Sequence, residues 1–351
     1  MKRILSIVMA FVLVLTLFSA CGKKGTPEQP GKEPEKPESS VPKATGVTVK
    51  LATLQGPTGM GMAYLLDDSD NGKTLNKYEY TVASSPDEIT GKLISGNFDI
   101  AAVPTNAAAT LYNKSNGKVK LLALNTGCVL YILEKGNTIK SISDLKGKTV
   151  YVSGQGATPE YILNYVLSEN GLKPGTDVKI DFTYSAHNDL VAYAASGKAD
   201  VLLLPEPAAT ALLAQNKDMR VALSISDVWA DTVKGTSYEG TQIAMGCVAV
   251  NTEFAEAHPD AVEAFLYEYE KSIKDITNTE NLDKSAETIA KVGIVAKAGI
   301  AKSALPRCNI IFAKGEEMKK MTEGFYKVLF DAQPNSVGGK LPDENFYYKA
   351  K

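Results

Sequence analysis

The sequence predicts an α/β protein built from two similar lobes, because one pattern of residues occurs twice along the chain. Gln55-Gly56-Pro57-Thr58 returns as Gln155-Gly156-Ala157-Thr158. Each copy follows a short β-branched run and precedes an apolar run at helical spacing. Further on, the segment GNFDIAAVP at 96–104 is matched by GKADVLLLP at 197–205. An internal repeat of this kind indicates a duplicated supersecondary unit, so we expect two α/β lobes.

The length and composition are those of a globular protein. At 351 residues, with 44% hydrophobic and 22% charged residues, the chain is long enough for two domains of ordinary size. A formal net charge of -2 gives no electrostatic footprint for nucleic acid, so we expect no such partner. The only arginines are Arg3, Arg220 and Arg307. Arginine is the preferred residue for holding carboxylate, sulfonate or phosphate groups.

The N-terminus has the pattern of a targeting segment. Lys2 and Arg3 precede an apolar run at 4–18, and small residues then lead to Cys21. This arrangement resembles a bacterial lipobox, which implies that residues 1–20 are a signal peptide and that Cys21 is lipidated. An ordinary secretory signal with a chance cysteine, or an uncleaved anchor, is the alternative. Residues 21–46 are rich in proline and charge, and we expect them to form a disordered tether.

The first lobe begins at Val47 with alternating strands and helices. We expect strands at 47–54, 78–83, 98–103 and 119–124, and helices at 57–66, from 85 onward and at 105–112. Ser85, Pro86 and Glu88 give the middle helix its start, as a cap, a first helical residue and the acid of a capping box. Short connections between alternating elements favour parallel strands.

The second lobe repeats this order. We expect strands at 149–152, 178–184, 201–204 and 221–225, and helices that start near 158, 187 and 205. A strand at 242–250 and a helical C-terminal third, including a helix at 261–276, follow. The similar joints 126–129 (TGCV) and 245–248 (MGCV) are candidates for two crossing strands that act as a hinge. We therefore expect lobe 1 to comprise 47–127 and 248–351, and lobe 2 to comprise 128–247.

Two further segments carry a family resemblance. The segments DLKGKTV at 144–150 and ADVLLLPEP at 199–207 occur in a chain that also has the lipobox, the tether and the duplicated lobe. Together they resemble the solute-binding lipoproteins of ABC importers, within the nitrate, sulfonate/taurine and thiamine-precursor group. The resemblance covers residues 47–351. It implies a two-lobed clamshell of the type II periplasmic-binding-protein fold, with one small molecule in the cleft.

The resemblance also implies partners and a location. The bound molecule would be delivered to a membrane permease that is driven by a separate ATPase. The protein would be a monomer outside the cytoplasm, anchored to the outer face of the cell membrane by lipidated Cys21.

Ligand-binding residues are expected in the loops that follow the carboxyl ends of the strands, where ligands bind in open α/β sheets. The candidates are Gln55, Gly56, Pro57, Thr58, Gly59, Met60, Ser84, Ser85, Thr105, Asn106, Asn125, Gln155, Gly156, Thr158, Glu206, Trp229 and Gln242. Several of these residues can have a purely structural role instead of contacting a ligand. The glycines can serve tight turns, and Thr58 and Thr158 can cap helices. Glu206 can be a solvated charge, and Trp229, in an expected loop at 226–240, can simply pack.

The residue types in these loops indicate the charge and shape of the ligand. None is an arginine, which argues against a strongly anionic ligand. Glu206, amides, hydroxyls and aromatic rings favour a planar molecule that is neutral or weakly basic. A small anion such as a sulfonate or nitrate, held by backbone N–H groups, is the alternative.

An enzyme on the same fold is the competing class of function. The sequence has no Gly-x-Ser-x-Gly, no His-Glu-x-x-His, no P-loop and no cluster of metal-ligand residues, so we expect no enzyme, metal or cofactor. The only histidines are His187, in a loop that can line the cleft, and His258, at a helix start.

Beyond Cys21, the chain has three cysteines, Cys128, Cys247 and Cys308. The first two lie in the two similar joints. They either approach within disulfide range or are small buried hydrophobic residues.

Overall fold

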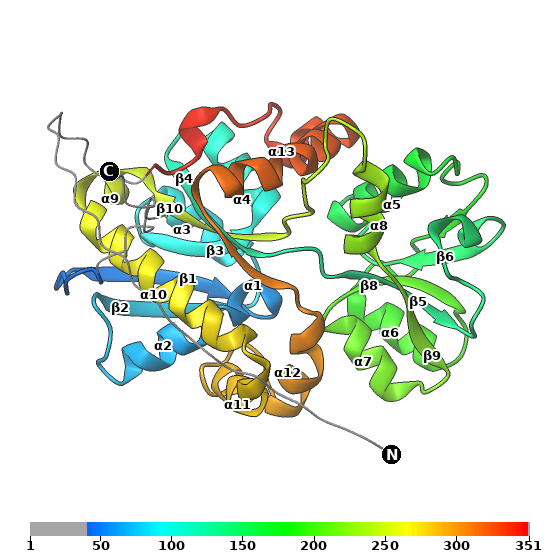
Figure 1. Cartoon of the computed structure of the whole chain (residues 1–351), viewed down its shortest axis with the longest axis horizontal. Helices are drawn as coiled ribbons and strands as arrows, with labels where there is room; N and C mark the ends of the chain where they lie inside the picture. The colour runs from blue at the N-terminus through cyan, green and yellow to red at the C-terminus, as the bar shows by residue number, and fades with distance from the viewer. Residues whose placement is uncertain (1–40, 350–351) are drawn as a thin grey trace, which may run out of the picture. The chain divides into compact units, whose positions relative to one another are not determined.

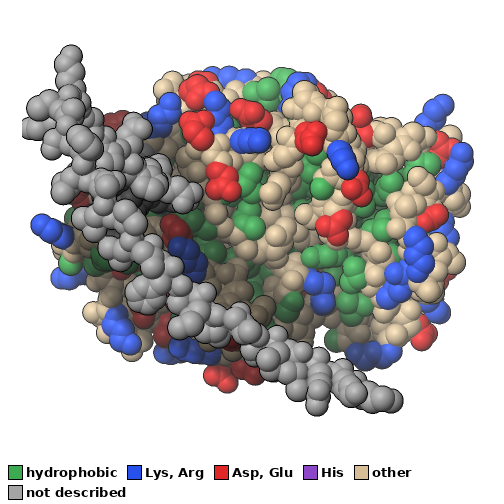
Figure 2. All heavy atoms as spheres, viewed as in Figure 1, with side chains coloured by type: hydrophobic (Ala, Val, Ile, Leu, Met, Phe, Trp, Pro, Cys, Tyr) green, Lys and Arg blue, Asp and Glu red, His purple; other side chains and the backbone are tan. Residues whose placement is uncertain are grey.

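The computed structural model describes residues 41–349. The predicted signal peptide, Cys21 and the tether as far as residue 40 lie outside the described residues. Within the described range no helix has the length and apolar character needed to span a bilayer. Positive and negative side chains are interspersed over the face shown in Figure 2, in keeping with the small net charge.

Six strands form the first sheet, in the order β11-β4-β10-β3-β1-β2. Their bounds are β1 Thr48–Leu54, β2 Lys77–Ala83, β3 Ile100–Pro104, β4 Val119–Thr126, β10 Gly246–Asn251 and β11 Ile310–Ala313. Strand β1 runs parallel to β2 and β3, as predicted. Strand β10 is antiparallel to both β3 and β4, and β11 is antiparallel to β4. The prediction of parallel strands is therefore correct only for half of this sheet.

Five strands form the second sheet, in the order β7-β6-β8-β5-β9. Their bounds are β5 Leu130–Lys135, β6 Thr149–Val152, β7 Lys179–Asp181, β8 Val201–Pro205 and β9 Met219–Ser224. Strand β6 runs parallel to β7 and β8, whereas β5 is antiparallel to β8 and β9. The central strands of each sheet are buried on both faces, which explains their continuous apolar sequences.

Helices cover both sheets (Figure 1). Their bounds are α1 Pro57–Met60, α2 Ala63–Asp70, α3 Asp87–Ile94, α4 Thr105–Lys114, α5 Thr158–Glu169, α6 His187–Ala195, α7 Ala208–Gln215, α8 Ile225–Val233, α9 Thr252–Ala257, α10 Pro259–Thr277, α11 Leu282–Lys291, α12 Ala298–Ala304 and α13 Gly315–Ala332. Helices α2, α10, α11 and α12 enclose one hydrophobic core on the six-stranded sheet. Helices α6 and α7 enclose another on the five-stranded sheet. A third core extends without a break from α3, α4 and α13 to α5 and α8.

The chain crosses between the sheets at residues 127–129, after β4, and again at 234–245, before β10. Gly246 pairs with Thr126 in the antiparallel ladder of β10 and β4, so the two crossings adjoin. The strand predicted at 242–250 begins only at Gly246, because residues 241–245 belong to the crossing. Cys128, Cys247 and Cys308 are buried free thiols, which matches the alternative of small hydrophobic residues.

The predicted α/β fold is confirmed, but one predicted helix is divided and three elements were not predicted. The helix expected at 57–66 is divided into α1 and α2 near Gly61, where a Cβ would lie 2.9 Å from Cγ1 of Ile273 on α10. Strands β5 and β11 and helix α8 were not predicted. Trp229 accordingly lies in a helix and not in the loop expected at 226–240.

Candidate ligand-binding site

Two sets of loops follow the carboxyl ends of the parallel strands. In the six-stranded sheet, β1, β2 and β3 lead into α1, α3 and α4. In the five-stranded sheet, β6, β7 and β8 lead into α5, α6 and α7. Leu54 pairs with Ala83 at the ends of β1 and β2, and Gln55 N donates to Ala83 O over 2.9 Å. The structure therefore brings the candidates Gln55 and Ser84 together.

The first Gln-Gly-x-Thr loop is a sharp turn that hydrogen bonds from neighbouring elements hold in place. Gly56 has φ of 83°, which favours glycine, and its N–H donates to Ile294 O over 3.0 Å. A Cβ at Gly59 would lie 2.0 Å from Leu54 O, so this glycine permits close packing of α1 on the end of β1. Asn125 Nδ2 donates to Thr58 O over 3.1 Å, and Thr126 Oγ1 lies 3.4 Å from Pro57 O.

The second loop repeats the turn. Gly156 has φ of 71°, and its N–H donates to Oε2 of Glu160 over 2.7 Å. Tyr161 closes the loop from the other side, because its hydroxyl donates to Gly156 O over 2.7 Å. Gln155 and Gly156 are exposed, and Thr158 is half-buried.

Neither threonine of the repeat caps its helix. The N-cap positions belong to Gly56 and Ala157, and neither helix has a side-chain cap hydrogen bond. The alternative role of Thr58 and Thr158 as caps is therefore wrong. Both side chains are half-buried, so their hydroxyl groups remain available at the carboxyl ends of β1 and β6.

The Ser84-Ser85 loop already has an acceptor for its donors. Oε1 of Glu88 accepts from Ser84 N over 3.2 Å, from Ser84 Oγ over 2.5 Å and from Ser85 N over 3.1 Å. Hydrogen bonds from Ser84, and then from Ser85, lower the pKa of Glu88. Glu88 thus accepts from the residues before the helix, but the predicted capping box is wrong, because the N-cap residue is Pro86 and not Ser85. The negative charge of Glu88 disfavours binding of an anionic ligand at the Ser84-Ser85 loop.

A histidine and a serine tie the loops after β6 and β7 to each other. His187 Nδ1 lies 2.7 Å from Oγ of the buried Ser153, and Gly154 N donates to Ser185 O over 2.8 Å. Partial removal from water lowers the pKa of His187, so the ring is neutral near pH 7. Neither residue is among the ligand-binding candidates from the sequence, although His187 was expected in a loop that can line the cleft. The signal that identifies them is position, since each stands where a parallel strand of this sheet leads into a helix.

Several candidates have side chains that lie away from solvent. Met60, Thr105 and Asn125 are 0% exposed, and Trp229 is 1% exposed. Trp229 Nε1 donates to Thr241 O over 3.1 Å, and its ring lies 5.2 Å from that of Tyr165. For Trp229 the structure therefore shows packing, which was one of the two predicted alternatives.

The last three candidates differ in exposure and in their hydrogen-bond partners. Asn106 is half-buried, and its Nδ2 donates to Ser336 O over 3.4 Å. Gln242 is exposed in the second crossing, and its N–H donates to Met321 O over 3.0 Å. Glu206 is buried, and its Oε1 accepts from Nε of Arg307 over 2.5 Å.

The described arginines are both engaged in ion pairs. Arg307 binds Glu206, and Nη2 of Arg220 lies 2.6 Å from Oε2 of Glu134. No cluster of three or more metal-ligand side chains occurs among residues 41–349.

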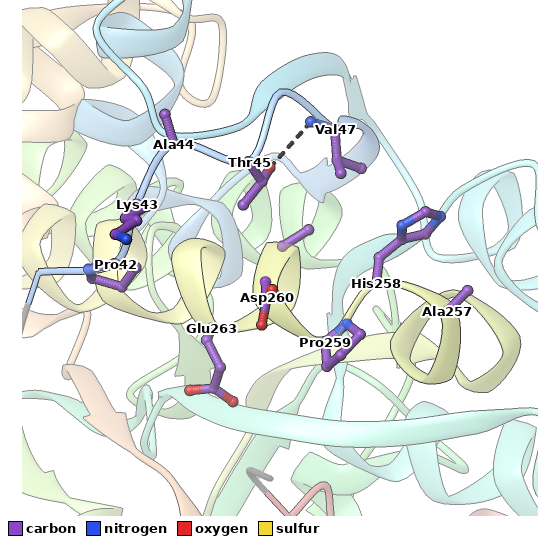
Figure 3. A pocket seen from close by; sticks show the side chains of 11 residues that line it. Pro42, Lys43, Ala44, Thr45, Val47, Ala257, His258, Pro259, Asp260 and Glu263 are labelled. Atoms are coloured by element: carbon purple, nitrogen blue, oxygen red, sulfur yellow. Dashed lines mark hydrogen bonds between the residues drawn. The ribbon is translucent and has the colours of Figure 1, made fainter.

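A cavity of about 540 Å³ lies on another part of the protein (Figure 3). The entering segment 42–47 forms one wall, and the junction of α9 and α10 at His258 and Pro259 forms the other. Asp260 and Glu263 contribute carboxylates to its lining. It contains none of the predicted ligand-binding residues, so we assign it no part in the candidate site.

Comparison with known proteins gives one family and many structures of the same fold. Residues 64–296 match the model of a family described as ABC transporter, phosphonate, periplasmic substrate-binding protein. No curated protein matches the chain in sequence.

Three solved structures illustrate the shared fold. An ABC transporter protein from Parabacteroides distasonis is 24% identical, covers 88% of this chain and 100% of its own, and has a TM-score of 0.71. The periplasmic aliphatic sulphonate binding protein SsuA from Escherichia coli is 16% identical, with coverage of 88% and 94% and a TM-score of 0.66. The alkanesulfonate-binding protein SsuA from Xanthomonas axonopodis pv. citri is 15% identical, with coverage of 85% and 95% and a TM-score of 0.57.

Proposed function

Because the chain belongs to this family of periplasmic substrate-binding proteins of ABC transporters, we propose that it captures one small molecule between its two loop sets and delivers it to a permease. The observation that carries this proposal is the repeated Gln-Gly-x-Thr loop. Both copies turn at a glycine with positive φ, and both leave a threonine hydroxyl available at the carboxyl end of a parallel strand. Paired loops of this kind suit a ligand held from two sides.

The proposed lobes have the boundaries expected from the sequence. Lobe 1 comprises 47–127 and 248–351, and lobe 2 comprises 128–247. The arrangement of strands supports this division except at residues 246 and 247, because β1 to β4, β10 (Gly246–Asn251) and β11 share one sheet and β5 to β9 share the other. Rotation about the adjoining crossings at 127–129 and 234–245 would then open and close the cleft.

The preferred ligand is a planar molecule that is neutral or weakly basic. Carboxylates of Glu88 and Glu160 already accept from loop N–H groups that would otherwise be offered to an anion. Both described arginines are neutralised by buried glutamates. Neutral His187, with Gln55 and Gln155, supplies uncharged hydrogen-bonding groups for a heteroaromatic edge.

The second candidate ligand is a small oxyanion. The names of the matched family and of the two SsuA proteins support it, since they refer to phosphonate and sulfonate. Backbone N–H groups at helix starts can hold such an anion without arginine.

A thermal-shift screen separates the two candidates. The screen would include pyrimidine-type heteroaromatics, methylphosphonate, ethanesulfonate and nitrate, each followed by calorimetry. A ligand at 100 times its Kd adds about 2.7 kcal/mol to the free energy of unfolding, which is readily detected. We expect a heteroaromatic compound to raise Tm. Tight binding of methylphosphonate or ethanesulfonate, without binding of any heteroaromatic, would establish the oxyanion instead.

We further propose that the protein is a monomer held at the outer face of the membrane by lipidated Cys21. The lipobox resemblance of residues 17–21 supports the anchor. Mass spectrometry of the mature N-terminus should show a diacylated Cys21, and an unmodified Cys21 would refute the anchor.

A further inference from the structure

Glu206 and Arg307 form an ion pair that links the two sheets. Glu206 directly follows β8 of the five-stranded sheet, and Arg307 directly precedes the segment that leads into β11 of the six-stranded sheet. Arg307 Nε lies 2.5 Å from Oε1 of Glu206. The glutamate side chain is 0% exposed and the arginine side chain is 32% exposed. The pair is therefore largely protected from the water and salt that weaken surface ion pairs.

Further hydrogen bonds involve Glu206 or Arg307. Arg307 Nη2 donates to Oγ1 of Thr210 over 2.5 Å, and Thr210 N donates to Oε2 of Glu206 over 3.1 Å. The hydroxyl of Tyr131 donates to Arg307 O over 2.8 Å. Tyr131 belongs to β5 and Thr210 to α7, so these bonds join Arg307 to the five-stranded sheet and its helix, while Arg307 Nη2 also donates to Ser303 O of α12 over 3.3 Å. Helix α12, which precedes Arg307, packs against α7 (Figure 1).

The pair also adjoins the first crossing of the chain. Asn309, two residues beyond Arg307, accepts at its carbonyl from Gly127 N over 2.9 Å. Its Nδ2 donates to Cys128 O over 3.1 Å. A Cβ at Gly127 would lie 2.3 Å from this Nδ2, so the contact requires glycine. Rotation of one lobe about residues 127–129 would therefore alter the separation of Glu206 and Arg307.

We propose that Glu206 and Arg307 are positioning residues, which set the separation of the two loop sets through their buried ion pair. Among the residues described by the structure, no other salt bridge joins 47–127 or 248–349 to 128–247. Glu206 stands at the carboxyl end of β8, beside the loops that follow β6 and β7, so the pair acts where the ligand would be held. Its role in capture rests on the proposed function, whereas the link itself is a property of the free protein.

The chain contains a matched control pair. Glu134 on β5 and Arg220 on β9 lie 2.6 Å apart, with side chains 2% and 31% exposed. This pair has nearly the same burial, but both residues belong to the five-stranded sheet. Breaking either pair removes a buried charge partner, and only the Glu206–Arg307 pair can affect the placement of one sheet relative to the other.

The experiment uses the ligand-free protein and three variants. Glu206→Gln removes the charge, Thr210→Val removes the oxygen that accepts from Arg307, and Glu134→Gln is the control. Small-angle X-ray scattering gives the radius of gyration, and thermal unfolding gives Tm. We expect Glu206→Gln and Glu134→Gln both to lower Tm, by about 5 °C. Only Glu206→Gln and, to a smaller extent, Thr210→Val should increase the radius of gyration.

The scattering results decide the proposal without any ligand. A wild-type radius for Glu206→Gln together with a reduced Tm would show that the pair only stabilises the fold. If Glu206→Gln does not fold, Thr210→Val decides, and a wild-type radius for that variant overturns the proposal. Failure to find a ligand in the thermal-shift screen would count against the proposed function alone.

Discussion

Asn125 donates from Nδ2 to the carbonyl oxygen of Thr58 over 3.1 Å, and this bond supports the first Gln-Gly-x-Thr loop from the end of β4. Oδ1 of Asn125 accepts from Thr126 Oγ1 over 2.9 Å. The side chain of Asn125 is 0% exposed, so this residue supports the loop from the interior. Gly246, which pairs with Thr126 on the neighbouring strand, leaves the space that both side chains occupy.

Gly246→Ala should disturb this support. A Cβ at position 246 would lie 2.5 Å from Oδ1 of Asn125 and 2.9 Å from Cβ of Thr126. We expect the free energy of unfolding to fall by about 1–3 kcal/mol, because buried side chains must shift to admit the methyl group. Denaturant unfolding measures the change. Gly91→Ala is the control, since a Cβ there meets no atom within 4 Å and replaces glycine inside helix α3. A Gly246→Ala variant as stable as Gly91→Ala would contradict the explanation.

Glu134 should contribute stability that is lost in acid. Burial opposes ionisation of this carboxyl, yet hydrogen bonds from Thr138, Ile139 and Arg220 lower its pKa from 4.5 to about 2. Between these two values the unfolded chain binds more protons, so stability falls as the pH falls from 4.5 toward 2. Unfolding curves of the wild type and Glu134→Gln should therefore differ most above pH 5 and converge near pH 2. A constant difference across this range would disprove the assignment.

His187 should make the stability of the protein depend on pH in a second range, at higher pH than Glu134. Its pKa lies below the ordinary value of 6.5, because the loop partly removes the ring from water. Protonation is thus easier in the unfolded chain, and stability should decline as the pH falls through 6.5. In His187→Asn this decline should be absent between pH 7.5 and pH 5.5, about one unit to either side of the ordinary value. Thermal unfolding at fixed ionic strength tests this, and an unchanged slope in the variant would exclude His187 as the source.

The repeat predicted the fold because each copy indicates a strand and the loop that follows it. The runs at 47–54 and 149–152 are short, β-branched and followed by glycine, so both strands and the loops after them were identified from local sequence. Strands β5 and β11 were missed for a physical reason. Both pair antiparallel with distant strands, and those partners are set by the tertiary fold and not by local sequence.

The site could be predicted only as far as its loops. Position in the sequence identified the Gln-Gly-x-Thr turns, since glycine with positive φ is a local property. It could not show that the carboxylate of Glu206 binds Arg307, which lies 101 residues away. The pairing of Ser153 with His187 likewise depends on the parallel register of β6 and β7.

Thr58 and Thr158 provide the most direct test of whether the two Gln-Gly-x-Thr loops bind the ligand. Each hydroxyl is half-buried at a helix start without serving as its cap. If both bind the ligand, Thr58→Val and Thr158→Val should each weaken binding of the compound found by thermal shift by about 3- to 10-fold, the cost of one hydrogen bond. Tm of the ligand-free protein should stay unchanged, because valine preserves the shape of the side chain. Thr232→Val is the control, since Thr232 is half-buried on α8 and its Oγ1 donates to Val228 O over 2.6 Å, away from both loops. Calorimetry that finds wild-type affinity for both loop variants would show that the repeat serves only the architecture of the fold.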